Sequence, residues 1–295
     1  MVRPDAKLHI WVITIMPVTN DSYTLAIVLG NTNARHFRLL LRSILNQSRL
    51  PAEVLYVGLP MTGSAVAHHA SRRPLALDVE QRLLWCPIAD SDEPMVNWSI
   101  LETVAYSAQT GSVLITSSDV VAHRDFAGAL LDLAGTTAIA TSFPVVLSPA
   151  LSDRLDEPAI DAGEPFASWW RVLMDGIFGQ THRAARIIPS GRLGAALDRL
   201  SLGRQLSSSA LAMTRQTLDQ LLSVRHHGNS SSRLPALLAS AGIRYQCATR
   251  QARHARLAET RPQIFALAPI TESQWSTPPL GVLDVRPVLH RHRLN

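Results

Sequence analysis

The chain has 295 residues, enough for one large domain or two smaller ones with a sizeable core. Its 46% hydrophobic and 17% charged residues exclude an intrinsically disordered protein. The net charge of +5 is compatible with an anionic ligand, an acidic membrane surface or nucleic acid. Because the arginines are dispersed, aromatic residues make up only 5% and no recognition motif is visible, we expect no nucleic-acid binding.

An apolar segment, Leu8–Val18, lies near the start of the chain and follows Arg3 and Lys7. It is too short to cross a membrane, so a signal peptide and an extra strand remain as alternatives. We favour an N-terminal extension or extra strand over residues 1–23, because the polar residues TNDSY separate the segment from any small-residue cleavage site.

The next segments have the pattern of a βαβ unit. Thr24–Leu29 is a continuous apolar run, which is typical of a buried parallel strand. The turn Gly30–Asn33 follows, and then apolar residues at helical spacing predict a helix over Ala34–Gln47. Glu53–Val57 is the second strand. The unit therefore predicts a parallel pair of strands with a right-handed crossover.

The chain between this unit and the next helix is less regular. Gly58–Gln81 is predicted to be a loop, with a weak helical patch over Ala65–His69 whose adjacent histidines are surface residues. Arg82–Cys86 is predicted to be a third strand. A helix is predicted to begin at Asn97, after an acidic turn, and to end at Gly111.

A short apolar run, Val113–Thr116, predicts a buried strand that ends in Ser117, Ser118 and Asp119. A helix is predicted to start near Asp125. Ligands of α/β proteins bind outside the carboxyl ends of the strands, so the Asp119 carboxylate is placed to hold a metal or a phosphate-bearing ligand. The alternative is an ordinary strand-to-helix turn rich in turn-forming residues.

After a predicted strand at Ala138–Phe143, the character of the chain changes over Leu147–Gln205. An acidic loop is predicted over Asp153–Glu164. The adjacent Trp169 and Trp170 allow two interpretations, since tryptophan rings stack on the C–H faces of sugars and also fill ordinary cores.

The remaining elements are predicted as a strand over Ser207–Met213, a helix over Thr214–Leu222, a helix over Arg233–Ala241 and a strand over Ile243–Cys247. The two cysteines, at positions 86 and 247, lack the spacing of metal ligands. They fit thiols in a reducing compartment, with a single disulfide as the alternative.

Several phrases occur in an order typical of one enzyme family. They are Gly30–Asn33 after the first strand, Ser43–Gln47 (SILNQ) at the end of a helix, Glu53–Val57 (EVLYV) as a strand, and Gly111–Val120 as an apolar strand ending in Ser-Ser-Asp. Over roughly Thr24–Arg256 the chain resembles the family 2 glycosyltransferases of GT-A fold. The resemblance implies an α/β fold with a mixed, mainly parallel sheet flanked by helices.

The resemblance also implies how the chain is organised. One GT-A-like, Rossmann-like domain covers residues 24–260, with a nucleotide-sugar half at 24–146 and an acceptor-side half at 147–260. A Pro-rich tail follows at 261–295. The implied activity moves a sugar from a nucleotide diphosphate sugar to a glycan, lipid-linked or natural-product acceptor, as in polysaccharide biosynthesis. The expected location is the cytoplasm, with peripheral association at the inner face of the membrane as an alternative.

The family's binding residues can be carried over by position. The resemblance implies that Asp119 and His254 bind a divalent cation, Mn²⁺ or Mg²⁺. His123, four residues after Asp119, could share such a ligand. The positions matching donor-binding residues of the family are Asn31, Thr32, Asn33, Asn97, Ser117, Ser118, Asp119 and His254.

The chain departs from the family where the family has acids. Gly58-Leu59-Pro60 follows the second strand in place of a base-contacting aspartate, Asp-x-Asp is reduced to the Ser-x-Asp of residues 117–119, and residues 229–232 contain no acid. An alternative function is therefore a catalytically degenerate GT-A-like binding or assembly protein. If the chain is an enzyme, arginines could neutralise the leaving diphosphate in place of a metal. The candidates are Arg215, Arg233, Arg250, Arg253 and Arg256.

Overall fold

The structure is a computed structural model that describes residues 22–30, 32–58, 64–72, 75, 77–86, 98–135, 138–188, 210–226, 238–247 and 252–258. Residues 1–21 of the predicted N-terminal extension and the whole predicted C-terminal tail lie outside these ranges, as do the predicted site residues Asn31 and Asn97. Tyr23, which the prediction assigned to the extension, belongs to the first strand of the large sheet. For His254 and Cys247 the structure describes the backbone alone.

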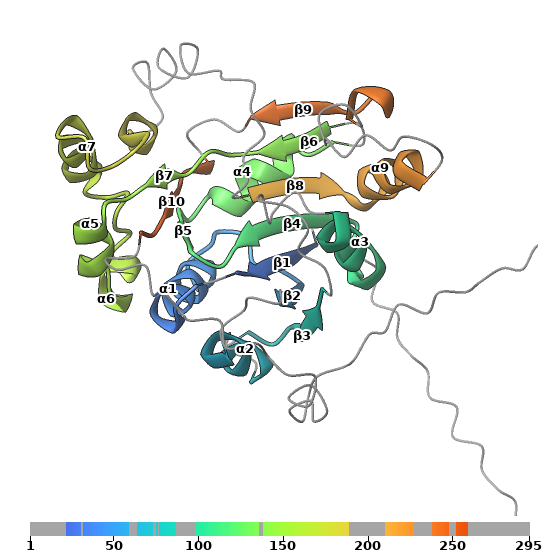
Figure 1. The fold of residues 1–295 in the computed structure, drawn as a ribbon, viewed down its shortest axis with the longest axis horizontal. Helices are drawn as coiled ribbons and strands as arrows, with labels where there is room; N and C mark the ends of the chain where they lie inside the picture. The colour runs from blue at the N-terminus through green and yellow to red at the C-terminus, as the bar shows by residue number, and fades with distance from the viewer. Residues whose placement is uncertain are drawn as a thin grey trace, which may run out of the picture.

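A seven-stranded sheet forms the centre of the molecule, in the order β3-β2-β1-β4-β8-β6-β9 (Figure 1). Strand β8 is antiparallel to β4 and β6, and the other neighbouring pairs are parallel. The predicted fold, a mixed and mainly parallel sheet flanked by helices, is confirmed. The strands are β1 Tyr23–Leu29, β2 Glu53–Gly58, β3 Glu80–Trp85, β4 Ser112–Ser117, β6 Ala138–Thr141, β8 Ala210–Thr214 and β9 Arg244–Cys247.

Helices cover both faces of this sheet, because its strands carry apolar side chains on both sides. In β1, Leu25, Ile27 and Leu29 join one hydrophobic core, and Ala26 and Val28 join the other. The first core is closed by α1 Ala34–Leu45, α2 Ser64–Ser71 and α4 Phe126–Leu133, and the second by α3 Trp98–Ser107 and α9 Arg215–His226.

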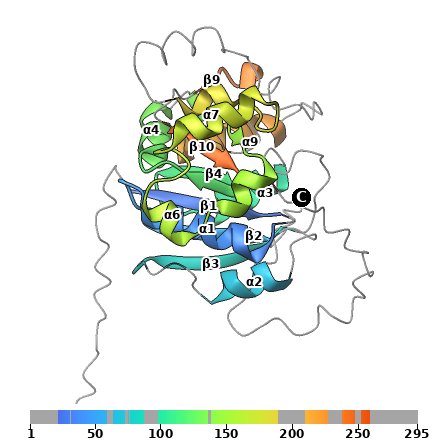
Figure 2. The same ribbon diagram turned by 90° about the vertical axis from the view of Figure 1, so that its left-hand side faces the viewer.

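A second sheet of three short strands lies beside the first, in the order β5-β10-β7. Its strands are β5 Val120–Ala122, β7 Val145–Val146 and β10 His254–Arg256. Strand β10 is antiparallel to β5 and parallel to β7. Figure 2 shows α6 and α7 on this side of the molecule. The third core unites this sheet with α5 Pro149–Arg154, α6 Glu157–Asp161, α7 Trp169–Ile177 and the 3₁₀-helix η2 Ala184–Ile187.

The prediction of an acidic loop over Asp153–Glu164 is wrong, because this region contains the end of α5 and all of α6. The residues that suggested a loop are helix caps. The side chain of Ser148 accepts a hydrogen bond at the start of α5, and that of Asp156 does so at the start of α6. Each helix has a proline in its first turn, where a missing N–H costs nothing.

The other differences from the sequence concern short elements. The predicted loop Gly58–Gln81 contains α2, eight residues long, and its two adjacent histidines are exposed as predicted. Strands β5, β7 and β10 have two or three residues each, too few for alternation to show. Cys86 is a buried thiol. Within the described ranges, no helix has both the length and the apolar character that crossing a bilayer requires.

Candidate functional site

The strand order reverses between β1 and β4. The chain passes from β1 through α1 to β2 on one side of β1, whereas β4 pairs with the other side, where Val28 lies opposite Ser117. Open α/β sheets bind ligands outside the carboxyl ends of the strands at such a point. The residues gathered there are Thr32, Asn33, Ser117, Ser118, Asp119 and Arg256, and we call them the β1/β4 site.

Hydrogen bonds join the two strand ends of this site. The hydroxyls of Thr32 and Ser118 lie 2.7 Å apart, and both residues are buried. The Ser118 N–H donates to the Val28 carbonyl at 3.1 Å. Asn33 is the N-cap of α1, because its side chain accepts a hydrogen bond from the His36 N–H at 2.8 Å. The predicted residues Thr32, Asn33 and Ser118 are therefore brought together around the start of α1.

Asp119 uses both of its carboxylate oxygens within the protein. One accepts a hydrogen bond from the Ser117 hydroxyl, and the other accepts one from Nε of Arg256 at 2.6 Å. The Asp119 carbonyl also accepts the N–H of Leu257 at 2.9 Å. The Asp119 side chain is only 14% exposed, whereas that of Arg256 is 50% exposed. The carboxylate therefore orients a guanidinium that faces solvent.

The free end of Arg256 can receive an anion. Its two Nη groups make no hydrogen bond with any residue that the structure describes. A guanidinium presents its N–H groups as a planar fork, which matches phosphate and carboxylate oxygens in pairs. Because Asp119 fixes the Nε side of the fork, the remaining side is oriented in advance for a ligand.

The structure separates Arg256 from two of the other predicted arginines, Arg215 and Arg253. Arg215 lies at the opposite end of β4, where its Nη1 donates to the Ala108 carbonyl at 2.7 Å. Arg253 donates to the Ile187 carbonyl at 2.8 Å. Arg233 and Arg250 lie outside the described residues. His254 lies in β10, two residues before Arg256 in the chain, and its backbone pairs with Ala122 of β5.

The oxygen atoms at Asp119 do not fit a divalent cation. Mg²⁺ and similar cations favour several oxygen ligands, with carboxylates whose lone pairs are available. Here the carboxylate already accepts hydrogen bonds at both oxygens, and a guanidinium lies 2.6 Å from one of them. The part of the chain that the structure describes contains no group of three His, Cys, Asp or Glu side chains placed to hold a metal. Among the described residues, Arg256 is the cationic group that lies beside Asp119.

His36 is a part of the site region that the sequence did not indicate. It is buried, and burial lowers the pKa of its imidazole, with the neighbouring Arg35 acting in the same direction and Asp119 and Asp153 opposing both. Arg35 donates hydrogen bonds at 2.6, 2.9 and 2.9 Å to carbonyls at the end of α5. His36 is thus a buried imidazole with a lowered pKa behind the site, and only its position near the helix start could have drawn attention to it.

The phrase SILNQ, on which the resemblance partly depends, has a structural role. The Ser43 hydroxyl accepts the Ala122 N–H at 3.2 Å. The amide of the buried Gln47 donates to the His123 carbonyl at 2.9 Å and accepts the Ala127 N–H at 3.1 Å. These bonds fix α1 to the segment that follows Asp119, so the phrase positions the site without forming part of it.

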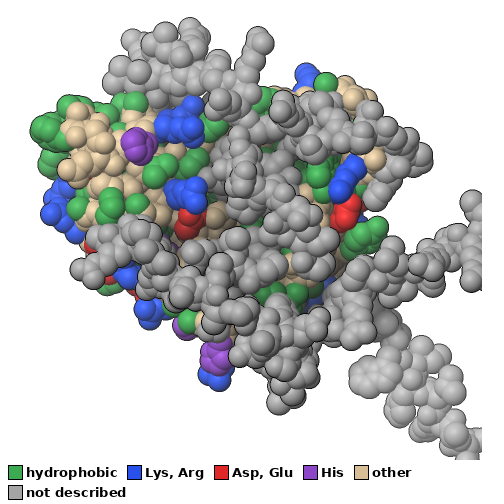
Figure 3. Space-filling view, in the orientation of Figure 1, with side chains coloured by type: hydrophobic (Ala, Val, Ile, Leu, Met, Phe, Trp, Pro, Cys, Tyr) green, Lys and Arg blue, Asp and Glu red, His purple; other side chains and the backbone are tan. Residues whose placement is uncertain are grey.

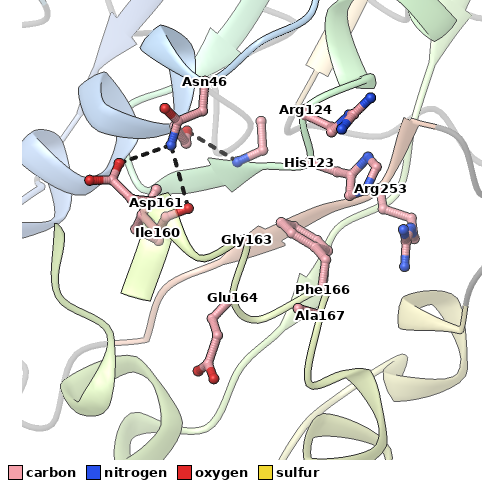
Figure 4. A pocket seen from close by; sticks show the side chains of 12 residues that line it. Asn46, His123, Arg124, Ile160, Asp161, Gly163, Glu164, Phe166, Ala167 and Arg253 are labelled. Atoms are coloured by element: carbon pink, nitrogen blue, oxygen red, sulfur yellow. Dashed lines mark hydrogen bonds between the residues drawn. The ribbon is translucent and has the colours of Figure 1, made fainter. Parts of the chain in front are cut away.

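A cavity of about 440 Å³ lies at the other end of β5 (Figure 4). Asn46 and Asp161 lie on one side of it, and His123 and Arg253 on the other. Asp161 is already paired with Arg42 at 2.5 Å and accepts a hydrogen bond from Asn46 at 3.1 Å. Burial, and then Arg253, lower the pKa of His123. His123 therefore belongs to this cavity and not to the β1/β4 site.

No protein-family model matches the sequence, and no curated protein matches it. Among solved structures, the chain is similar to a mannosyltransferase from Pyrobaculum calidifontis in complex with GDP-Man and Mn²⁺. The TM-score is 0.45 and the identity 18%, over 81% of this chain and 57% of that chain. The chain therefore spans little more than half of the mannosyltransferase.

Two further solved structures are similar to the chain. Glucosyl-3-phosphoglycerate synthase from Mycobacterium tuberculosis, in complex with phosphoglyceric acid, has a TM-score of 0.40 and 13% identity over 82% of this chain and 73% of that chain. A structure of TarS from S. aureus has a TM-score of 0.31 and 14% identity over 42% of this chain and 36% of that chain. The likeness is one of fold, and the GT-A-like fold of this chain follows from its own strand order and flanking helices.

Proposed function

We propose that this chain is a glycosyltransferase that moves a sugar from a nucleotide diphosphate sugar to a glycan, lipid-linked or small-molecule acceptor. The donor's diphosphate binds at the β1/β4 site, which the half formed by residues 24–146 builds together with Arg256 of β10, and the acceptor binds on the side of residues 147–260. The observation that carries the proposal is the Arg256 guanidinium, which Asp119 holds at the point where the strand order reverses.

The site suits a diphosphate for several reasons. The exposed fork of Arg256 can pair with two phosphate oxygens. The hydroxyls of Thr32 and Ser118 lie nearby as additional hydrogen-bonding groups. The 12-residue helix α1 begins immediately after Asn33, and the partial positive charge of a helix N-terminus favours anions. Together these features place hydrogen-bond donors for an anion at one end of β1 and β4.

Arg256 also suits the chemistry of sugar transfer. The acceptor hydroxyl oxygen forms a bond to the anomeric carbon as the bond from that carbon to the phosphate oxygen breaks, and the hydroxyl proton passes to the departing diphosphate or to solvent. Negative charge then increases on the departing diphosphate, and a cation oriented beforehand lowers the energy of that transition state. Asp119 acts as a positioning residue, because it contacts Arg256 and holds its guanidinium in place.

A second function, binding or assembly without catalysis, is supported by one observation. Asp119 is the acid that the Ser-x-Asp motif retains, and hydrogen bonds to Ser117 and Arg256 occupy its carboxylate. Such a protein would bind the nucleotide or a partner without breaking the glycosidic bond. Release of nucleoside diphosphate from a donor sugar, lost in Asp119→Ala, would exclude this function.

The test is a thermal-shift panel of nucleoside diphosphates and their sugars, followed by an assay for donor turnover. Guanosine and uridine donors are included because solved structures similar to this chain contain GDP-Man and UDP. We expect at least one nucleoside diphosphate to raise the Tm, and Arg256→Gln to remove that shift. If no nucleotide in the panel raises the Tm of the wild-type chain, the proposal is wrong.

A further inference from the structure

Helix α7 exposes a row of large apolar side chains. The row consists of Trp170, Met174, Ile177 and Phe178, which are 56%, 43%, 66% and 75% exposed, and we call it the α7 stripe. Only two other large hydrophobic side chains in the described part of the chain are exposed, Leu50 and Tyr106. Figure 3 shows hydrophobic side chains gathered at the upper left, where Figure 1 places α7. Among the described residues, the exposed large apolar side chains are thus concentrated on α7 and the residue that follows it.

The spacing of the stripe makes it a continuous face. Residues 170, 174, 177 and 178 follow one another at intervals of four, three and one positions, so their side chains lie on one side of a helix. The opposite side holds α7 on the protein, where Val172 is buried in the third core. Gly176 lies so close to Ala184 of η2 that a Cβ on the glycine would overlap the alanine side chain. The helix is therefore fixed with its apolar face directed outward.

The charges around the stripe are mainly positive. Between residues 164 and 188 the chain has the arginines 171, 183 and 186 and the acids Glu164 and Asp175. The Glu164 carboxylate lies 4.0 Å from Nη1 of Arg171. The Asp175 carboxylate accepts a hydrogen bond from the Thr181 hydroxyl at 2.5 Å. Arg171 is 59% exposed and lies over the ring of Trp170, with 5.6 Å between its guanidinium carbon and the ring centroid. An apolar face with the exposed Arg171 beside it is complementary to a surface that is apolar inside and negatively charged outside.

We infer that the α7 stripe docks on the surface of a lipid bilayer that contains anionic lipids. Amphipathic helices with aromatic and aliphatic residues on one face and arginines beside it lie in the plane of the membrane interface. Tryptophan is favoured at that depth, and arginine can extend to the phosphate groups. A second copy of the chain would instead bring the arginines of two such faces together, which disfavours it as the occupant. The inference is independent of the proposed sugar transfer, because it concerns binding alone.

The experiment is co-sedimentation of the full chain with vesicles. One set contains phosphatidylcholine alone, and the other contains phosphatidylcholine mixed with phosphatidylglycerol. The test variant is Ile177→Asp, which places a charge in the centre of the stripe. The matched control is Tyr106→Asp, which places the same charge on an exposed apolar residue of α3, and the Tm of each variant shows whether it is folded.

We expect wild type to sediment with the mixed vesicles and Ile177→Asp to partition at least about tenfold less, since the stripe loses apolar contact. Tyr106→Asp should behave as wild type. Arg171→Gln should weaken binding to mixed vesicles about fivefold and leave binding to phosphatidylcholine unchanged, because only the charge is removed. If Ile177→Asp proves unstable, Trp170→Ser and Phe178→Ser provide the same comparison with smaller polar groups.

Equal sedimentation of wild type and folded stripe variants would overturn the inference, as would failure of wild type to sediment with mixed vesicles. Light scattering in the absence of lipid measures whether the chain is a monomer or a dimer, and this result can also overturn the inference. If wild type is a dimer that Ile177→Asp converts to a monomer, and neither protein binds vesicles, then the stripe covers a second copy of the chain and not a membrane.

Discussion

Arg256 donates its Nε hydrogen to Asp119 at 2.6 Å, although the two residues are 137 positions apart in the sequence. The pairing changes the character of the corner where β4 ends. A carboxylate there would attract cations, whereas the pair presents the open side of a guanidinium. The corner for which the sequence predicts a metal or a phosphate-bearing ligand therefore presents guanidinium N–H groups.

Replacing Arg256 by glutamine should weaken binding of a nucleoside diphosphate about tenfold to a hundredfold, since a hydrogen bond to a charged group contributes about 1.5–3 kcal/mol. Isothermal titration calorimetry measures the change. The matched control is Arg124→Gln, because Arg124 also lies beside an aspartate but is 74% exposed and lies at the far end of β5. Equal loss of affinity in both variants would mean that Arg256 has no specific contact with the diphosphate.

Removal of divalent cations should leave donor binding unchanged, because both Asp119 oxygens are occupied by Ser117 and Arg256. The measurement is the Tm shift caused by a nucleoside diphosphate in EDTA and in Mn²⁺. A shift that occurs only with Mn²⁺ would contradict the proposed role of Arg256. In that event Asp119→Asn should remove the effect of Mn²⁺, which would identify the carboxylate as a ligand.

Stability should decrease when the pH falls below about 6.5, the ordinary pKa of histidine. The pKa values of His36 and His123 are lowered in the folded protein, chiefly by burial, so these imidazoles take up protons more readily in the unfolded chain. Their contribution is complete above the unfolded pKa and is lost as the pH falls toward the folded pKa. The Tm should therefore rise as the pH is raised from about 5 to about 8, a range that brackets the ordinary pKa of histidine.

The variant His36→Gln should flatten this dependence, whereas His69→Gln, at an exposed position of α2, should not. The pKa of Asp161 is also lowered, by hydrogen bonds from Arg42 and then Asn46. Its contribution is present above its ordinary pKa of 3.8 and is lost below that value, so it falls in a more acidic window. An unchanged pH profile in both His36→Gln and His123→Gln would contradict the assignment to these histidines.

Glu53→Gln should lower the free energy of unfolding by about 3 kcal/mol, because it breaks a buried ion pair. The Glu53 side chain is 3% exposed and accepts hydrogen bonds from Arg82, from the Thr24 hydroxyl at 2.6 Å and from the Gln109 N–H at 2.9 Å. The matched control is Glu80→Gln, since Glu80 pairs with the same arginine but is 49% exposed. It should cost less than about 1 kcal/mol in a urea titration. Similar losses in the two variants would mean that burial does not determine the effect.

Gly176→Ala should destabilise the protein by about 1–3 kcal/mol, because the added methyl group overlaps Ala184. Gly128→Ala is the matched control in α4, where an added Cβ meets nothing within 4 Å. It should leave stability unchanged or raise it by up to about 1 kcal/mol, the difference in helix propensity. Thermal unfolding compares the two. A neutral Gly176→Ala would show that α7 and η2 separate easily.

The sequence predicted the main sheet well because its strands are local patterns. The strands β1, β2 and β4 are continuous apolar runs, and helix α1 has its apolar residues at helical spacing. The parallel pairing of β1 and β2 follows from one crossover connection, and it is confirmed by the register of Thr24 opposite Glu53. Burial on both faces makes such strands visible without knowledge of their neighbours.

The small sheet could not be predicted in the same way, because its strands are short and their partners are distant. Val145–Val146 and His254–Arg256 have no periodicity of their own and become strands by pairing with each other. Arg256 appeared in the sequence as one of five similar arginines. Its distinction arises from β10, which places it beside Asp119, and that pairing depends on contacts across more than a hundred residues.

Strand β10 also has a consequence for the order in which the protein is made. During synthesis, β1, α1, β4 and Asp119 leave the ribosome well before residues 254–256, and N-terminal segments generally fold first. Most of the large sheet can therefore assemble while the corner still lacks its arginine. A nascent chain stopped before β10 would carry a carboxylate without its guanidinium, so the Asp119–Arg256 pair forms only after the strands of the large sheet have been synthesised.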